Sequence, residues 1–155
     1  MDQELFRLLN RVDDPEECEA PAEFDLEAEV NAVRNLILPL NELVGRDFVL
    51  NDRIEDAPFF AELSIIDWTT NPSGGKDGNG IISLRFSAFG RLFIVWSPCP
   101  QYKKLDPRVI EQVIDLVRRS GYVYVDAEAL VEPYEGGNPA LKGRYTWWGR
   151  YFDWF

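Results

Sequence analysis

Residues 81–89 read IISLRFSAF, and this stretch decides the fold that we expect. Apolar and polar residues alternate along it, which is the two-residue period of a strand with one buried face and one polar face. The apolar set is Ile82, Leu84, Phe86 and Ala88, and the polar set is Ser83, Arg85 and Ser87. The stretch therefore predicts a strand at the centre of a sheet.

Two further apolar stretches flank this strand. Residues 59–68, FFAELSIIDW, precede it, and residues 92–97, LFIVWS, follow it. Residues 69–80 are rich in Gly, Asn, Asp and Pro, which is typical of a loop, and Gly90 indicates a tight turn. Because short connections join antiparallel neighbours, we expect three consecutive antiparallel strands.

The clearest helix is predicted over residues 106–121, DPRVIEQVIDLVRRSG. Asp106 is a suitable N-cap, Pro107 suits the first helical position, and Gly121 suits the end. Residues 122–130, YVYVDAEAL, then alternate again and predict a fourth strand. Its expected inner residues are small, and its expected exposed residues, beside Ser83 and Arg85, are Tyr122, Tyr124, Asp126 and Glu128.

The N-terminal third predicts two helices separated by a linker. Residues 2–12 place Leu5, Leu8 and Leu9 on one helical face, and residues 13–23, DDPEECEAPAE, have the prolines and like charges of a linker. Residues 25–40 have helical periodicity, with Asp25 as N-cap and Pro39 as a kink or end. We therefore expect residues 1–23 to form a mobile acidic arm and residues 24–155 to form a single domain.

The C-terminal residues 143–155, GRYTWWGRYFDWF, hold seven aromatic residues. Their spacing predicts a helix laid onto the sheet, because a wide apolar face lies opposite a narrow polar stripe. The polar stripe consists of Thr146, Arg150 and Asp153. The apolar face consists of Trp148, Tyr151, Phe152 and Phe155, and Trp147 and Trp154 lie at its flanks. We expect Trp148 to be buried.

These elements follow one another in the order α-α-β-β-β-α-β-α. They predict an α+β fold, with a mainly antiparallel sheet of about four strands and helices packed on one face.

The composition excludes several chemistries. The 155 residues include no His, which removes Ser-His-Asp triads and zinc sites that contain His. Cys18 and Cys99 form no CxxC pair, so we expect free thiols. The chain has neither an apolar run long enough to span a membrane nor the features of a signal peptide, so we expect a cytoplasmic protein. We expect no catalytic residue, cofactor or metal ion.

The net charge of −11 is concentrated near the N-terminus, where residues 1–30 hold 11 acidic and 2 basic residues. This charge argues against nucleic acid as a partner, since such binding needs Lys and Arg at the phosphates. It is compatible with a basic protein partner, and the alternative explanation is that it serves solubility.

A small, acidic, His-free α+β chain rich in Trp and Tyr resembles, in size and composition alone, the immunity proteins that neutralise bacterial toxins. The resemblance implies an inhibitor whose acidic, aromatic face occludes a basic partner. The candidate partner-binding residues are Tyr122, Tyr124, Asp126 and Glu128, followed by Asp52, Glu55 and Asp56. The alternatives are an ordinary polar sheet face, a regulatory interaction module that docks its N-terminal arm, and a carboxylate enzyme with a divalent metal.

Overall fold

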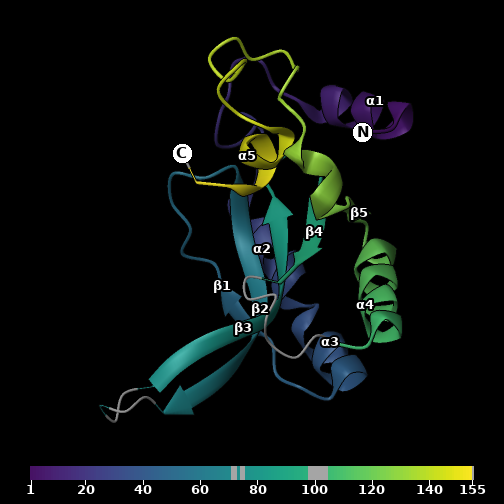
Figure 1. Ribbon diagram of the computed structural model, residues 1–155, viewed down its shortest axis with the longest axis vertical. Helices are drawn as coiled ribbons and strands as arrows, with labels where there is room; N and C mark the ends of the chain where they lie inside the picture. The colour runs from purple at the N-terminus through teal and green to yellow at the C-terminus, as the bar shows by residue number, and fades with distance from the viewer. Residues whose placement is uncertain (71–72, 74–75, 98–104, 155) are drawn as a thin grey trace.

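The computed structural model describes residues 1–70, 73, 76–97 and 105–154. Its centre is a five-stranded sheet in the order β1-β2-β3-β4-β5, in which only the β4–β5 pair is parallel (Figure 1). The strands are β1 (Val49–Asn51), β2 (Phe59–Thr70), β3 (Lys76–Ser87), β4 (Leu92–Trp96) and β5 (Val123–Tyr124). The predicted α+β class with a mainly antiparallel sheet is confirmed.

Helices precede, interrupt and follow the strands along the chain. They are α1 (Gln3–Val12), α2 (Leu26–Arg34), α3 (Ile37–Val44), α4 (Pro107–Arg119), the 3₁₀ helix η1 (Ala127–Val131) and α5 (Trp147–Phe152). The predicted caps of α4 are confirmed, since Asp106 accepts a hydrogen bond from the Arg108 N–H and Pro107 begins the helix.

The single helix predicted over residues 25–40 is divided into α2 and α3 at Asn35 and Leu36. Pro39 lies in the first turn of α3, where a missing N–H leaves no helical hydrogen bond unmade. Gly45 ends α3 with φ of +69°, a conformation that glycine adopts without strain. Pro39 is therefore compatible with the start of a second helix.

The loop predicted over residues 69–80 is mostly strand. β2 continues to Thr70, β3 begins at Lys76, and these two residues pair with each other. The resulting hairpin projects beyond the rest of the protein (Figure 1). Two long paired strands satisfy each other's backbone groups, and this outweighs the low strand propensity of Gly and Asn. Residues 71–72 and 74–75 lie outside the described residues.

Helices contact both faces of the sheet, whereas the sequence predicts helices on only one face. Phe86 faces the side of α2, because its ring packs against Tyr122 at 5.0 Å and Tyr122 donates a hydrogen bond to Glu29 of α2. The neighbouring Arg85 points to the opposite face, where it donates to the Phe152 carbonyl of α5 at 2.5 Å. The expected polar face of β3 is thus buried beneath the C-terminal segment.

Arg150 of α5 lies at the centre of a buried polar cluster rather than on a solvent-exposed stripe. Its side chain is 0% exposed, and its Nε donates to the Asp13 carboxylate at 2.6 Å. The remaining guanidinium N–H groups donate to backbone carbonyls of residues Asp14, Glu17 and Cys18. Asp13 also accepts from the Tyr134 hydroxyl at 2.5 Å. We call Arg150, Asp13 and the carbonyls of residues 14, 17 and 18 the arginine knot.

The arginine knot ties the predicted arm to the C-terminal helix. Leu9 of α1 is fully buried, and its carbonyl accepts a hydrogen bond from the Tyr151 hydroxyl. Leu5 and Leu8 pack against the same core. Residues 1–23 therefore contribute side chains to the core, and the apolar face of α1 packs within the chain.

The two adjacent tryptophans of α5 exchange the positions that their spacing predicts. Trp147, expected at the flank, is buried against Tyr134 with ring centroids 4.8 Å apart. Trp148, expected in the core, is half-buried against Trp96 at 5.8 Å. The same short helix carries Arg150, whose acceptors in residues 13–18 hold it in place.

Candidate protein-binding site

The predicted strand over residues 122–130 is short, and this changes the candidate site. Only Val123 and Tyr124 form β5, which pairs with Leu92 and Phe93 of β4. Asp126 then accepts a hydrogen bond from the Glu128 N–H and caps η1, so the chain continues as a 3₁₀ helix beside β4. The four candidate residues therefore do not form one stripe along a strand.

Tyr122 is buried, and its predicted exposure is wrong. Its side chain is 3% exposed, and its hydroxyl donates to Glu29 at 2.9 Å. Burial, together with this hydrogen bond, raises the pKa of the Tyr122 hydroxyl. Parallel pairing with β4 turns Tyr122 toward the core and leaves Val123 exposed, the reverse of the predicted arrangement. Tyr122 is thus a core residue.

Tyr124 lies at the boundary between core and surface. Its half-buried ring packs against Phe93 with centroids 5.5 Å apart. Burial raises the pKa of its hydroxyl, and the nearby carboxylates Asp126 and Glu128 raise it further. The structure therefore keeps Tyr124, Asp126 and Glu128 together, with both carboxylates exposed.

These three residues line a hollow between the end of β4, the start of α4 and η1. We call it the edge hollow, and its volume is about 620 Å³, within the range of ligand sites. Apolar side chains form most of its wall, and its described lining includes no Lys or Arg. The lining residues are Ile81, Ile82, Val95, Trp96, Ser97, Leu105, Pro107, Ile110, Tyr124, Asp126, Ala127 and Glu128.

Trp96 was not among the predicted site residues. Its indole Nε1 is buried and makes no hydrogen bond with the described part of the chain. The Arg85 guanidinium lies 4.6 Å from the centre of its ring. No sequence signal distinguishes Trp96 from an ordinary strand residue, because its place at the hollow depends on where β5 ends.

Ser83 and Arg85, predicted to lie beside the Tyr122 stripe, are buried on the other face of the sheet. Arg85 forms an ion pair with Glu62 at 2.7 Å and stacks over the Phe59 ring at 4.2 Å. This side chain is enclosed by α5 and the sheet and is not part of the edge hollow.

The second group of candidates lies elsewhere. Asp52 forms an ion pair with Arg34 at 2.9 Å. Glu55 and Asp56 line a separate hollow of about 410 Å³, which we call the acidic hollow. Its other lining residues are Glu19, Ala20, Phe24, Leu26, Ile54, Ala57, Phe59, Phe60 and Ala88. The acidic hollow thus brings Glu55 and Asp56 together with Glu19 of the acidic N-terminal stretch, and Asp52 is not part of it.

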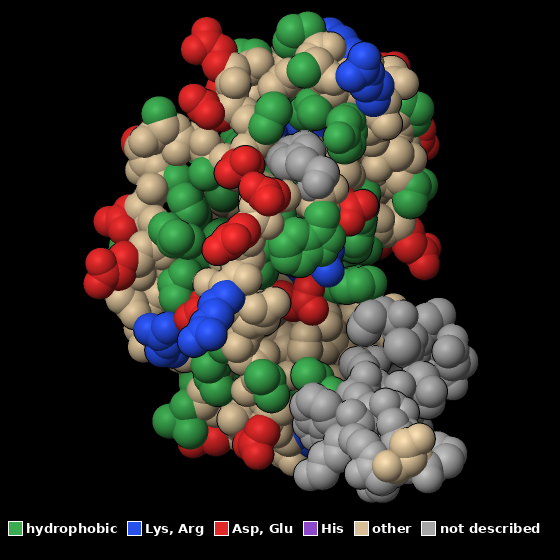
Figure 2. Space-filling model, turned by 90° about the vertical axis from the view of Figure 1, so that its left-hand side faces the viewer, with side chains coloured by type: hydrophobic (Ala, Val, Ile, Leu, Met, Phe, Trp, Pro, Cys, Tyr) green, Lys and Arg blue, Asp and Glu red, His purple; other side chains and the backbone are tan. Residues whose placement is uncertain are grey.

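One side of the molecule displays many acidic groups. Figure 2 shows Asp and Glu side chains spread among apolar ones, with fewer Lys or Arg side chains, on the side of the sheet that carries the edge strand β1. A surface of this kind attracts cationic groups and repels anionic ones.

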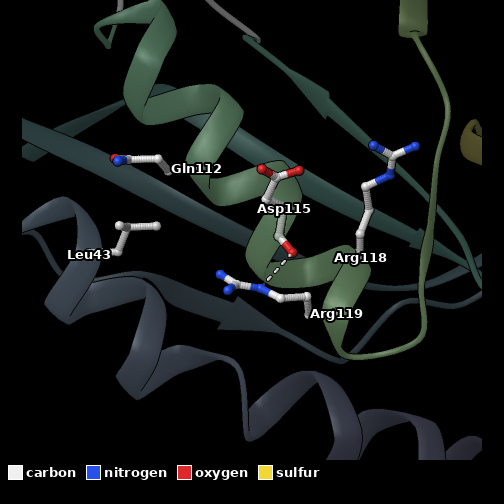
Figure 3. Close-up of a pocket in the computed structure, with 5 residues that line it drawn as sticks. All are labelled: Leu43, Gln112, Asp115, Arg118 and Arg119. Carbon is white, nitrogen blue, oxygen red and sulfur yellow. Dashed lines mark hydrogen bonds between the residues drawn. The ribbon is translucent and has the colours of Figure 1, made fainter.

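A third hollow lies between α3 and α4. It has a volume of about 500 Å³ and is lined by Leu43, Gln112, Asp115, Arg118 and Arg119 (Figure 3). Arg118 points away from Leu43, and Arg119 donates to the Asp115 carbonyl at 3.3 Å. Such separated polar side chains are typical of a solvated helix face.

Among the described residues, no group of three or more Cys, Asp or Glu residues could hold a metal ion. In the same part of the chain, every helix is too short or too polar to cross a membrane. Cys18 is a free thiol, and Cys99 lies outside the described residues.

Comparison with known proteins gives no relationship from which a function could be carried over. No family model matches the chain, and neither a curated protein nor a solved structure is significantly similar to it. A function must therefore be argued from the site itself.

Proposed function

We propose that this chain is a small acidic protein of the immunity or inhibitor type, which neutralises a basic partner such as a bacterial toxin by occluding it. The observation that carries the proposal is the edge hollow, whose aromatic and aliphatic wall has the exposed carboxylates Asp126 and Glu128 at its rim. Apolar anchors with a charged rim are the usual anatomy of a protein interface.

The charge of the whole chain supports the same partner. A net charge of −11 accelerates encounter with a basic protein and disfavours nucleic acid. We place this role in the cytoplasm, where the Cys18 thiol stays reduced. The acidic hollow, with Glu55 and Asp56, is the second candidate surface for the same partner.

The first experiment captures partners on the immobilised protein at low and at high salt. We expect a basic protein that is retained at low salt and released at high salt, because exposed charges are screened. The enzymatic activity of the captured partner should fall to zero when an equimolar amount of this protein is added. A partner whose activity is unchanged in the complex would contradict inhibition.

Two matched double variants then locate the surface. Asp126→Asn with Glu128→Gln removes two charges at the edge hollow, and Glu55→Gln with Asp56→Asn removes two at the acidic hollow. We expect the first variant alone to slow association with the captured partner by about tenfold, since rim charges act mainly on the association rate. An effect confined to the second variant would transfer the site to the acidic hollow. Unchanged binding by both would overturn the proposal.

A further inference from the structure

The edge of β4 beyond Phe93 has no neighbouring strand among the described residues. β5 pairs only with Leu92 and Phe93, whereas β4 continues to Trp96. The last hydrogen bond of this pair joins the Val125 N–H to the Phe93 carbonyl at 2.9 Å. After it the chain continues as η1, which lies close to β4 but forms no strand pairing with it. We call Ile94–Trp96 the open edge.

The alternation of backbone groups along a strand defines what the open edge presents. Backbone groups two residues apart point to the same side, so Val95 directs its N–H and carbonyl to the side on which Phe93 meets β5. The β3–β4 ladder, in which Leu84 pairs with Val95, lies on the opposite side. Val95 therefore offers one donor and one acceptor at the wall of the edge hollow.

An unpaired edge beside an apolar hollow is the arrangement that receives an added strand. Main-chain hydrogen bonds hold such a strand, and every second side chain enters the hollow. In this hollow the wall is apolar and the rim carries Asp126 and Glu128, with no cation among the described lining residues. Charge complementarity thus selects a segment in which apolar residues alternate with Lys or Arg.

We propose that the edge hollow binds an extended segment of a basic protein, which adds to β4 at Val95 as a strand in line with β5. Apolar side chains of this segment enter the hollow, and its Lys or Arg side chains meet Asp126 and Glu128. This inference rests on the proposed function and specifies how the basic partner is recognised.

The test uses a synthetic peptide of alternating Lys and Val and a copy that is N-methylated at alternate residues. N-methylation removes peptide donors along one edge and leaves the charge unchanged. We expect the parent peptide to bind about tenfold more tightly than the copy methylated on the edge that meets β4, because main-chain hydrogen bonds are lost. Amide exchange at Val95 should slow only with the parent peptide.

Variants of the protein complete the test. Val95→Pro removes the N–H at the open edge while leaving the β3–β4 ladder bonds in place, a position where proline is tolerated. Val95→Ala is the control, because it shortens the side chain and keeps the N–H. We expect weaker peptide binding by Val95→Pro than by Val95→Ala, with melting of each free variant measured in parallel.

The outcomes separate this inference from the proposed function. Equal binding of both peptides, with loss in Asp126→Asn plus Glu128→Gln, would leave a basic partner at this site and overturn strand addition. Retention of a basic partner by the intact protein, with no binding of either peptide, would also overturn it. Strand addition is supported only if methylation and Val95→Pro both weaken binding.

Discussion

Arg150 shows what a single residue contributes to this fold. Replacing it by Ala leaves the buried Asp13 carboxylate without its cation and removes the donors to three carbonyls. We expect Arg150→Ala to lower the free energy of unfolding by about 3–5 kcal/mol, the usual cost of breaking a buried pair. Urea denaturation measures this change. Arg144→Ala, at an exposed position, is the control, and an equal loss in both variants would contradict the arginine knot.

Tyr134 makes the same cluster sensitive to alkaline pH. Burial and the hydrogen bond to Asp13 raise the pKa of its hydroxyl from 10.0 to about 12. Between these values the unfolded chain releases the proton and the folded chain keeps it, so stability is retained below pH 10 and falls as pH rises to about 12. Unfolding in urea at several pH values should show a steeper decline for the wild type than for Tyr134→Phe. Identical slopes would refute this assignment.

At the scale of elements, the two adjacent tryptophans of α5 report which side of this helix faces the core. Trp147 is buried and Trp148 is half-buried, the reverse of the order that helical spacing predicts. We expect Trp147→Ala to cost about 3–5 kcal/mol, as for other large core residues, and Trp148→Ala to cost less. Chemical denaturation of the two variants compares adjacent residues of one type. A larger loss for Trp148→Ala would favour the arrangement predicted from the sequence.

Elements with a strong local pattern could be predicted, and those set by distant partners could not. The alternation of residues 81–89 and the caps of α4 are local, and the structure contains both elements. β5 ends after Tyr124 because Asp126 caps η1, although residues 122–130 alternate as far as Leu130. Tyr122 is buried, whereas Tyr124, Asp126 and Glu128 all line the edge hollow, although not as one strand face.

The whole molecule depends on contacts between its two ends. Arg150 has the spacing of a surface residue, and no local feature reveals that its acceptors lie in residues 13–18. We predict that a chain lacking residues 1–23 loses its cooperative unfolding transition, because the knot and Leu9 are removed together. Circular dichroism during heating measures this loss. A truncated chain that unfolds cooperatively at the wild-type temperature would show that residues 1–23 are dispensable.

A point substitution gives the same test without truncation. Leu9→Ala removes a fully buried side chain, and we expect it to cost about 2–5 kcal/mol. Leu38→Ala is the matched control, since Leu38 is 67% exposed and should have little effect. Equal destabilisation by the two substitutions, measured by urea denaturation, would mean that α1 does not belong to the core.

The arginine knot also sets an order of events during protein synthesis. Asp13 and Arg150 are separated by 137 positions, so Asp13 emerges from the ribosome long before its cation exists. Domains form from the N-terminus as they emerge, but this knot cannot close until α5 has left the exit tunnel. Until then, α1 and the first acidic residues remain without their main partner. Completion of this fold therefore waits for α5, and the acidic segment 13–18 stays without Arg150 until that helix has emerged.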